Sequence, residues 1–134
     1  MPSFKLDIVT PEKTVYSGTV DSFRAPGTEG GFGVLVRHHP MVASLDVGRI
    51  RFREEGGADL QMATSGGFAE VLGDHVTVLA ETAESEGEID VSRAEASRDR
   101  ARDRLQQEQE GVDRARAEAS LARALNRLSV AGGV

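Results

Sequence analysis

Hydrophobic and polar residues alternate along the first two thirds of the chain. In FKLDIV, residues 4–9, three apolar residues are separated by Lys5 and Asp7, and GRIRFRE, residues 48–54, repeats the alternation. A period of two residues is typical of strands that bury one side and expose the other. The pattern therefore predicts a series of short strands. Further runs of this kind lie at residues 19–26, 31–36, 59–73 and 75–81.

Short polar segments separate these runs, namely TPEK, APGTEGG, REEGGAD and LGD. Their glycines and prolines supply the backbone conformations of tight antiparallel connections. No helical period lies between the runs, and many short strands at close spacing are typical of a sandwich or barrel. We expect residues 1–87 to form an antiparallel β-sandwich.

Near Gly87 the pattern becomes helical. Asp90 can cap a first helix over residues 91–109, and Asp113 can cap a second that ends near Val130. The residues EG at 110–111 form the turn, and so short a connection makes the helices antiparallel neighbours. Residues 88–134 are therefore predicted to form an αα-hairpin. The whole chain is predicted to be an α+β protein that is mainly β.

The expected contact face between the helices consists mostly of alanine. Burying an alanine contributes about 2 kcal/mol less than burying a leucine in the same place. We therefore expect a hairpin that can undock or open at its turn, with a hairpin permanently packed on the sandwich as the alternative. The residues of the expected face are Ala94, Ala101 and Leu105 of the first helix and Ala115, Ala119, Ala122 and Leu125 of the second.

Four arginines of the hairpin can converge. Arg93 and Arg100 share one side of the first helix, and Arg123 and Arg127 share one side of the second. In an antiparallel pair the start of one helix lies near the end of the other, and arginine forks match the geometry of phosphate. The alternative is a solvated ladder of opposite charges three residues apart. Its pairs are Glu95 with Arg98, Asp99 with Arg102, and Arg100 with Asp103.

Charge and hydropathy exclude two classes of partner. The net charge of −6 argues against a general nucleic-acid binder. No stretch approaches the roughly 18 apolar residues that a membrane-crossing helix needs. The start, MPSFKLDIVT, lacks the basic and apolar regions of a signal peptide. We expect no nucleic-acid partner, no direct insertion into a membrane, and a chain that stays in the compartment where it is made.

No group of residues indicates catalysis or a metal site. The chain has no cysteine, and the adjacent His38 and His39 point to opposite sides if extended, so they do not readily share a metal. Walker, nucleophile-elbow and dinucleotide-binding motifs are absent from the sequence. The acidic residues Glu81, Glu84, Glu86 and Glu88 are expected to form a solvated linker. The sequence thus offers no catalytic residue and no metal ligand.

Several segments together resemble one known family. GGFGVLVRHHPMVASLDVGRIRF resembles its pattern of a glycine-rich turn, a strand, a histidine two residues before a proline and a further strand. ATSGGFAEVLGDHVTVLAETAE is similar to its Gly-Gly-Phe strand pair with an acidic exit, and IDVSRAEASRDRARDRL and LARALNRLSVAG are similar to its C-terminal helices. The family is the epsilon subunit of F-type ATP synthases, and the resemblance covers residues 4–132.

The resemblance implies a noncatalytic subunit of the rotary central stalk, which couples proton translocation to ATP synthesis at the cytoplasmic face of the cell inner membrane. Its implied partners are the gamma subunit, the membrane ring of c subunits, and the catalytic hexamer of alpha and beta subunits. An extended hairpin reaches that hexamer and inhibits ATP hydrolysis. The segment that matches the contact with gamma and the ring comprises Arg37, His38, His39, Pro40, Met41 and Val42.

The resemblance requires no cofactor but implies ATP as a regulatory ligand of the folded hairpin. Some bacterial epsilon subunits bind ATP through an IDxxRA motif, which IDVSRA matches here. The implied ATP-binding residues are Glu84, Ile89, Asp90, Arg93, Ala94, Arg100, Arg123 and Arg127.

Two other functions stay open. The chain could be a free-standing ATP-sensing module with the sandwich as a scaffold. A third interpretation is a small hydrolase that uses His75 or His38.

Overall fold

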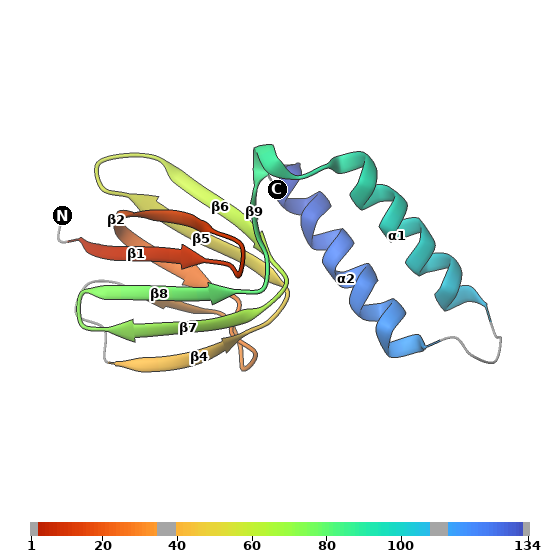
Figure 1. Ribbon diagram of the computed structural model, residues 1–134, viewed down its shortest axis with the longest axis horizontal. Coiled ribbons are helices and arrows are strands. Elements are labelled where there is room, and N and C mark those ends of the chain that lie inside the picture. The colour runs from red at the N-terminus through yellow and green to blue at the C-terminus, as the bar shows by residue number, and fades with distance from the viewer. Residues whose placement is uncertain (1–2, 35–39, 108–112, 133–134) are drawn as a thin grey trace. The chain divides into compact units, whose positions relative to one another are not determined.

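The computed structural model describes residues 3–34, 40–107 and 113–132 of the 134-residue chain. The chain divides into two compact units, Met1–Glu84 and Ser85–Val134. Strands make up the first unit and helices most of the second (Figure 1). The predicted fold class, an α+β chain with a β-sandwich followed by an αα-hairpin, is confirmed.

The strands of the first unit pair in the order β4-β7-β8-β1-β2-β5-β6-β9, and β3 also pairs with β2. Antiparallel pairing joins the consecutive strands β1–β2, β2–β3, β5–β6 and β7–β8, and also joins β2 to β5 and β4 to β7. The pair β1 and β8 is parallel, which departs from the expected antiparallel sandwich. The strands are β1 Phe4–Val9, β2 Thr14–Ala25, β3 Phe32–Val34, β4 Met41–Leu45, β5 Gly48–Glu54, β6 Asp59–Thr64, β7 Gly67–Leu72, β8 His75–Ala80 and β9 Ala83–Ser85.

Strand β2 belongs to both layers of the sandwich (Figure 1). Its residues 14–20 pair with β1, and its later residues pair with β5 and β3. The register shifts between Val20 and Ser22, as at a β-bulge, where a strand bends and twists more strongly. One strand of 12 residues therefore supplies hydrogen-bonding partners to both layers.

The core lies between the layers and is built from the alternating apolar residues. Leu6 and Ile8 of β1 and Ile50 of β5 are completely buried, which confirms the predicted inward sides of residues 4–9 and 48–54. Phe23 of β2 is also buried and its ring centroid lies 6.3 Å from that of Phe32. These contacts fix which side of each strand faces solvent, since shifting a strand by one residue would expose its apolar set.

The turn between β6 and β7 depends on two glycines. Gly66 and Gly67 have φ values of 126° and 139°, which side chains other than that of glycine rarely accept. A Cβ on Gly67 would collide with the backbone carbonyl of Leu79 in β8. The buried hydroxyl of Thr64 accepts a hydrogen bond from the N–H of Gly66 and donates one to its carbonyl, both at 3.2 Å. The turn thus sets β7 closely against β8.

The second unit begins with a 3₁₀ helix, η1 Glu86–Glu88, followed by α1 Val91–Gln106 and α2 Arg114–Ala131. The helices run antiparallel (Figure 1), and the predicted caps are confirmed. Asp90 accepts a hydrogen bond from the N–H of Arg93, and Asp113 accepts one from the N–H of Arg116, both at 3.0 Å. The first helix ends at Gln106, and its C-cap Gln107 is already extended, so the expected end at Gln109 was too late. The predicted turn at residues 110–111 lies outside the described residues.

The predicted contact face was right on α1 but wrong on α2. Ala94 and Ala101 of α1 are buried, whereas Ala115, Ala119 and Ala122 are exposed and Leu125 is 41% exposed. The buried alanines of α2 are Ala117 and Ala124, with Leu121 and Leu128 half-buried on the same side. This orientation of α2 partly buries Leu121 and Leu128, which lie on one side of the helix. Burying a leucine contributes more to stability than burying an alanine.

Candidate functional site

Four predicted site arginines flank the seam between the helices. Arg93 and Arg100 each precede a buried alanine of α1, while Arg123 precedes the buried Ala124 of α2 and Arg127 precedes a half-buried leucine. Successive helix residues are about 100° apart, so each arginine projects beside the contact face. In two antiparallel helices these sides fall on the same edge of the pair. We call Arg93, Arg100, Arg123 and Arg127 the arginine edge.

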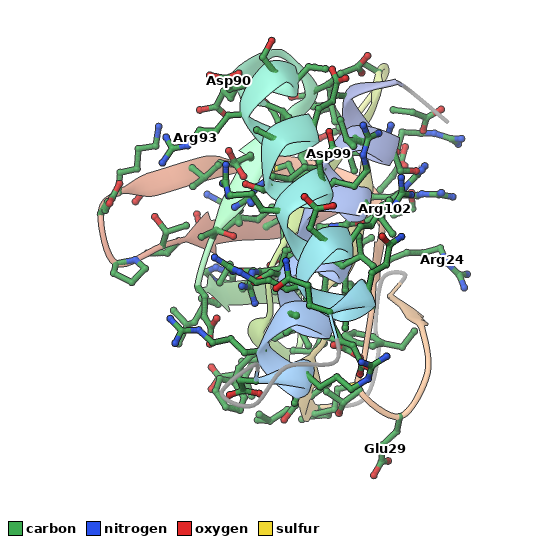
Figure 2. The ribbon with its side chains drawn as sticks, turned by 90° about the vertical axis from the view of Figure 1, so that its right-hand side faces the viewer. Arg24, Glu29, Asp90, Arg93, Asp99 and Arg102 are labelled. Atoms are coloured by element: carbon green, nitrogen blue, oxygen red, sulfur yellow. The ribbon has the colours of Figure 1, made fainter. Side chains whose placement is uncertain are left out.

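Hydrogen bonds hold two of these guanidinium groups in the same way. Nη2 of Arg100 donates to Oγ of Ser97, and Nη2 of Arg123 donates to Oγ of Ser120, each at 3.1 Å. Figure 2 shows Arg93 on one side of α1 and Arg102 on the other, so not every arginine of α1 belongs to this edge.

The predicted charge ladder is present only in part. Arg98 approaches Glu95 at 4.0 Å, as expected, and its Nε also lies 3.0 Å from Oδ1 of Asp99. Asp99 therefore pairs with its sequence neighbour, while Arg100 donates to a serine. Within the described part of the chain, the ladder does not account for Arg93 or Arg100.

The other predicted ligand-binding residues differ in exposure. Ile89 and Ala94 are buried, whereas Asp90 is an exposed helix cap. Glu84 is half-buried in β9 and ends the first compact unit, while the other seven predicted residues belong to the second. The structure thus brings the four arginines to one edge, with Asp90 at the start of the helix that carries two of them.

The acidic run at residues 81–88 is largely exposed and contains the boundary between the two units, as expected of a solvated linker, but it has regular local structure. Its residues form part of β9 and of η1. The carboxylate of Glu88 accepts hydrogen bonds from the backbone N–H of Ser85 at 3.1 Å and from its hydroxyl at 2.8 Å. Backbone pairing and this local capping order the segment, which sequence periodicity does not reveal in so short a stretch.

Of the segment predicted to contact gamma and the ring, Arg37, His38 and His39 lie outside the described residues. Pro40 is exposed just before β4, Met41 packs partly against the core, and Val42 points outward with 69% of its surface exposed.

Val42 lies on a larger apolar surface that the sequence reasoning missed. Phe68 of β7 is directly opposite Leu79 of β8, and these side chains are 55% and 57% exposed. Leu72, on the same side of β7, is 56% exposed, and Val42 of β4 is opposite Glu70 between them. We call Val42, Phe68, Leu72 and Leu79 the apolar patch. Exposed apolar side chains gathered on one side of a sheet are typical of an interaction surface.

A sequence signal for this patch was available. In GFAEVL the inward positions are Ala69 and Val71, yet the outward positions also include Phe68 and Leu72. A strand that is apolar on both sides is covered on both sides. The outer side of β7, where Glu70 lies between Phe68 and Leu72, therefore indicates a partner.

A polar cluster lies beside the patch on β1, β2 and β8. Oδ2 of Asp7 lies 2.6 Å from Nε2 of His75, and the hydroxyl of Ser17 donates to Oδ1 of Asp7 at 2.6 Å. The hydrogen bond from Ser17, followed by that from His75, lowers the pKa of Asp7 below its ordinary value. This arrangement has the carboxylate between the serine and the histidine, so the imidazole cannot activate the hydroxyl as a base. The hypothesis of a hydrolase at His75 gains no support from it.

Both units match family models of known proteins. Residues 3–86 match the family model of the ATP synthase delta/epsilon chain beta-sandwich domain, and residues 88–132 match that of the delta/epsilon chain long alpha-helix domain. The ATP synthase epsilon chain of Halalkalibacterium halodurans is 50% identical over 133 residues, which cover 98% of this chain and 99% of the relative. That of Syntrophobacter fumaroxidans is 52% identical over 128 residues, which cover 95% and 94%.

A solved structure agrees with these relatives. A chain in the cryo-EM structure of the Euglena gracilis mitochondrial ATP synthase, which contains OSCP, F1 and the c-ring in rotational state 1, superposes with a TM-score of 0.82 at 27% identity. The match covers 94% of this chain and 80% of that chain. The chain therefore belongs to the family of ATP synthase epsilon chains, the noncatalytic subunits of the central stalk.

Proposed function

We propose that this chain couples rotation of the proton-driven c-ring to ATP synthesis, as a stalk subunit fixed between the ring and the gamma subunit. Its position is peripheral, at the cytoplasmic face of the inner membrane. Family membership supports this proposal, as does the assembly with F1 and the c-ring in which the Euglena gracilis relative was solved. Among the described residues, no helix combines the length and the apolar character needed to cross a membrane.

The observation that carries the proposal is the apolar patch. We propose that gamma covers the outer side of β4, β7 and β8, and that the segment Arg37–Val42 extends this contact toward the ring. Val42 belongs both to that segment and to the patch. Burying a side chain such as Phe68 or Leu79 contributes about 1.5–3 kcal/mol, so the patch can hold a rotor subunit firmly.

A binding experiment with the cognate gamma subunit tests this contact. The double variant Phe68→Ser/Leu79→Ser should bind gamma at least about tenfold more weakly than the parent chain. Its melting temperature should stay close to that of the parent because both side chains are largely exposed. Leu60→Ser is the matched control, since Leu60 is an exposed leucine on β6, outside the patch. Unchanged affinity of the double variant would show that gamma binds elsewhere.

We further propose that the hairpin regulates hydrolysis and that its folded form binds ATP. The arginine edge supports this proposal because four guanidinium groups on one edge favour a polyphosphate. The proposed ligand residues are those of the IDxxRA match, Ile89, Asp90, Arg93 and Ala94, together with Glu84, Arg100, Arg123 and Arg127. When extended, the hairpin would reach the alpha and beta subunits and inhibit hydrolysis, so ATP would bias a two-state equilibrium toward the folded form.

Calorimetric titration with ATP tests the ligand directly. The parent chain should give saturable heat that Arg93→Ala abolishes and that Arg102→Ala, on the other side of α1, retains. Asp90→Ala and Asp113→Ala remove equivalent helix caps. Loss of ATP binding in Asp90→Ala but not in Asp113→Ala would show that Asp90 contacts the ligand. Equal ATP binding by the two variants would show that Asp90 serves only as a helix cap. A parent chain without saturable heat would remove ATP from the mechanism while leaving the stalk function intact.

A further inference from the structure

A second surface of the sandwich, away from the apolar patch, carries unneutralised positive charge. Arg24 of β2 and Arg51 of β5 are directly opposite each other in the register of these strands, and both side chains are exposed. Arg49 is two residues from Arg51 and therefore on the same side of β5. We call Arg24, Arg49 and Arg51 the strand arginines.

The arginines on this side of the sheet differ in their side-chain partners. Arg53, two residues further along β5, forms an ion pair with Asp59 of β6 at 2.9 Å. Arg49 donates to the uncharged side chain of Gln61 at 3.5 Å. In the stretches that the structure describes, Arg24 and Arg51 make no hydrogen bond or ion pair through their side chains. The chain has six more acidic than basic residues, yet it places none of the described acids against this pair.

This arrangement is unfavourable for the isolated chain. Like charges directly across a pair of strands destabilise the sheet, whereas opposite charges stabilise it. The Arg24 side chain also lies close to β3, because its Cγ and Nη1 are each 3.5 Å from the place that a Cβ on Gly33 would take. The Arg24 guanidinium therefore leans over β3, on the side of β2 away from β5. Exposed cations on neighbouring strands without an acidic partner are suited to an external anion that extends over both strands.

We propose that the strand arginines are a docking surface for an acidic, extended segment of another protein chain. Residues two apart on an extended strand are separated by about 6.6 Å, which is also the spacing from Arg49 to Arg51. A segment that runs along β5 with carboxylates on alternate residues can therefore meet both arginines, while Arg24 adds a charge from the neighbouring strand. The surface is independent of the gamma contact proposed for β4, β7 and β8.

The exposure of these arginines favours a chain of carboxylates over a single small anion. Arg24 and Arg51 are exposed on a strand surface, so a small anion between them would remain in contact with water, which weakens each ion pair. Several pairs made by one chain act together, because the second and third contacts form within an existing complex. The net charge of −6 disfavours nucleic acid as the occupant.

The test is a backbone NMR titration of the full chain with decaglutamate as the probe. Binding should shift the amide signals of β2 and β5 more than those of β4 and β7, and the shifts should decrease as salt is added. Arg24→Gln/Arg51→Gln should weaken the binding measured at β2 and β5 roughly fivefold, the size expected for two exposed ion pairs. Arg53→Gln is the matched control because Arg53 is already paired with Asp59, and it should change the affinity little.

Three outcomes would overturn the proposal. The first is a set of shifts confined to the hairpin, whose arginines also attract polyglutamate. The second is equal affinity of the parent and the double variant at β2 and β5. The third is equal or tighter binding of inorganic phosphate or of a single-stranded ten-nucleotide DNA at these strands, which would replace the acidic protein segment by a phosphate ligand. None of these outcomes depends on whether gamma binds the apolar patch.

Discussion

Asp7 of β1 and His75 of β8 are joined side chain to side chain across a parallel pair of strands, with 2.6 Å between Oδ2 and Nε2. The other carboxylate oxygen accepts from Ser17 of β2, also at 2.6 Å. One carboxylate therefore links three strands at the outer surface of the sandwich. The hydrogen bonds from Ser17 and His75 lower the pKa of Asp7, so the charged form is the one that stabilises the fold.

We predict that Asp7→Asn destabilises the chain by about 1 kcal/mol at neutral pH, the usual net value of such a hydrogen bond. Because the pKa of Asp7 is lowered from 3.8 in the folded state, its contribution is present above the unfolded pKa and is lost as pH falls through the folded one. The difference in the free energy of unfolding between the parent and Asp7→Asn should therefore be constant down to about pH 5 and shrink below about pH 4. Urea denaturation at a series of pH values measures it.

Ser17→Ala and His75→Gln separate the two causes. The hydrogen bond from Ser17 is the larger, so its loss should move the acid limb of the stability curve toward the ordinary carboxyl range more than the loss of His75 does. An acid limb that neither variant moves would mean that other carboxylates govern acid unfolding.

Gly67→Ala should be strongly destabilising. Gly67 has φ 139°, and a Cβ there would collide with the carbonyl of Leu79, so the variant should lose about 2 kcal/mol or more. Gly57→Ala, in the turn between β5 and β6, is the control because a Cβ there meets nothing within 4 Å. Thermal unfolding of the two variants should differ clearly. Similar melting temperatures would contradict the close approach of β7 to β8.

A matched pair of variants tests which side of α2 faces α1. Ala124→Asp places a carboxylate in the buried seam and should destabilise the hairpin by about 2 kcal/mol or more. Ala122→Asp makes the same change in the same helix at an exposed position, so its effect should stay within about 0.5 kcal/mol. Loss of helical circular dichroism on heating distinguishes them. The reverse order would restore the face built on Ala115, Ala119 and Ala122.

Removing one strand arginine should stabilise the isolated chain. Arg51→Gln ends the repulsion across β2 and β5 and should raise the melting temperature by roughly 1–3 °C at low salt. The gain should disappear at high salt, where the repulsion is already screened. Arg53→Gln should instead lower the melting temperature slightly, because it breaks the ion pair with Asp59. A salt-independent gain for Arg51→Gln would point to a cause other than charge.

Much of the fold was predictable because local signals and the tertiary structure agree. The alternation in FKLDIV and GRIRFRE places Leu6, Ile8 and Ile50 in the core, and Asp90 and Asp113 cap the helices as expected. The parallel pairing of β1 with β8 was not predictable in this way. It joins residues about seventy positions apart, and no turn between them sets their direction.

The candidate sites show the same limit. The seven-residue spacing of Arg93 and Arg100 was sufficient to place them on one side of α1, whereas the face of α2 depended on which of many alanines met the partner helix. The apolar patch and the Arg24–Arg51 pair arise from register between strands, such as Phe68 opposite Leu79. A single strand's pattern shows which side a residue faces but does not show its neighbour. The ligands proposed for the arginine edge and for the segment Arg37–Val42 stay predictions.

The continuous course of β2 has a mechanical consequence. Because its residues 14–20 are bonded to β1 and its later residues to β5, the two layers cannot slide past each other without stretching one covalent backbone or breaking a run of its hydrogen bonds. A shear force applied at β4, β7 and β8 is therefore carried across the core along a peptide chain as well as through side-chain contacts. The first unit should resist such loading as a single elastic body and should yield in one step when pulled across its layers.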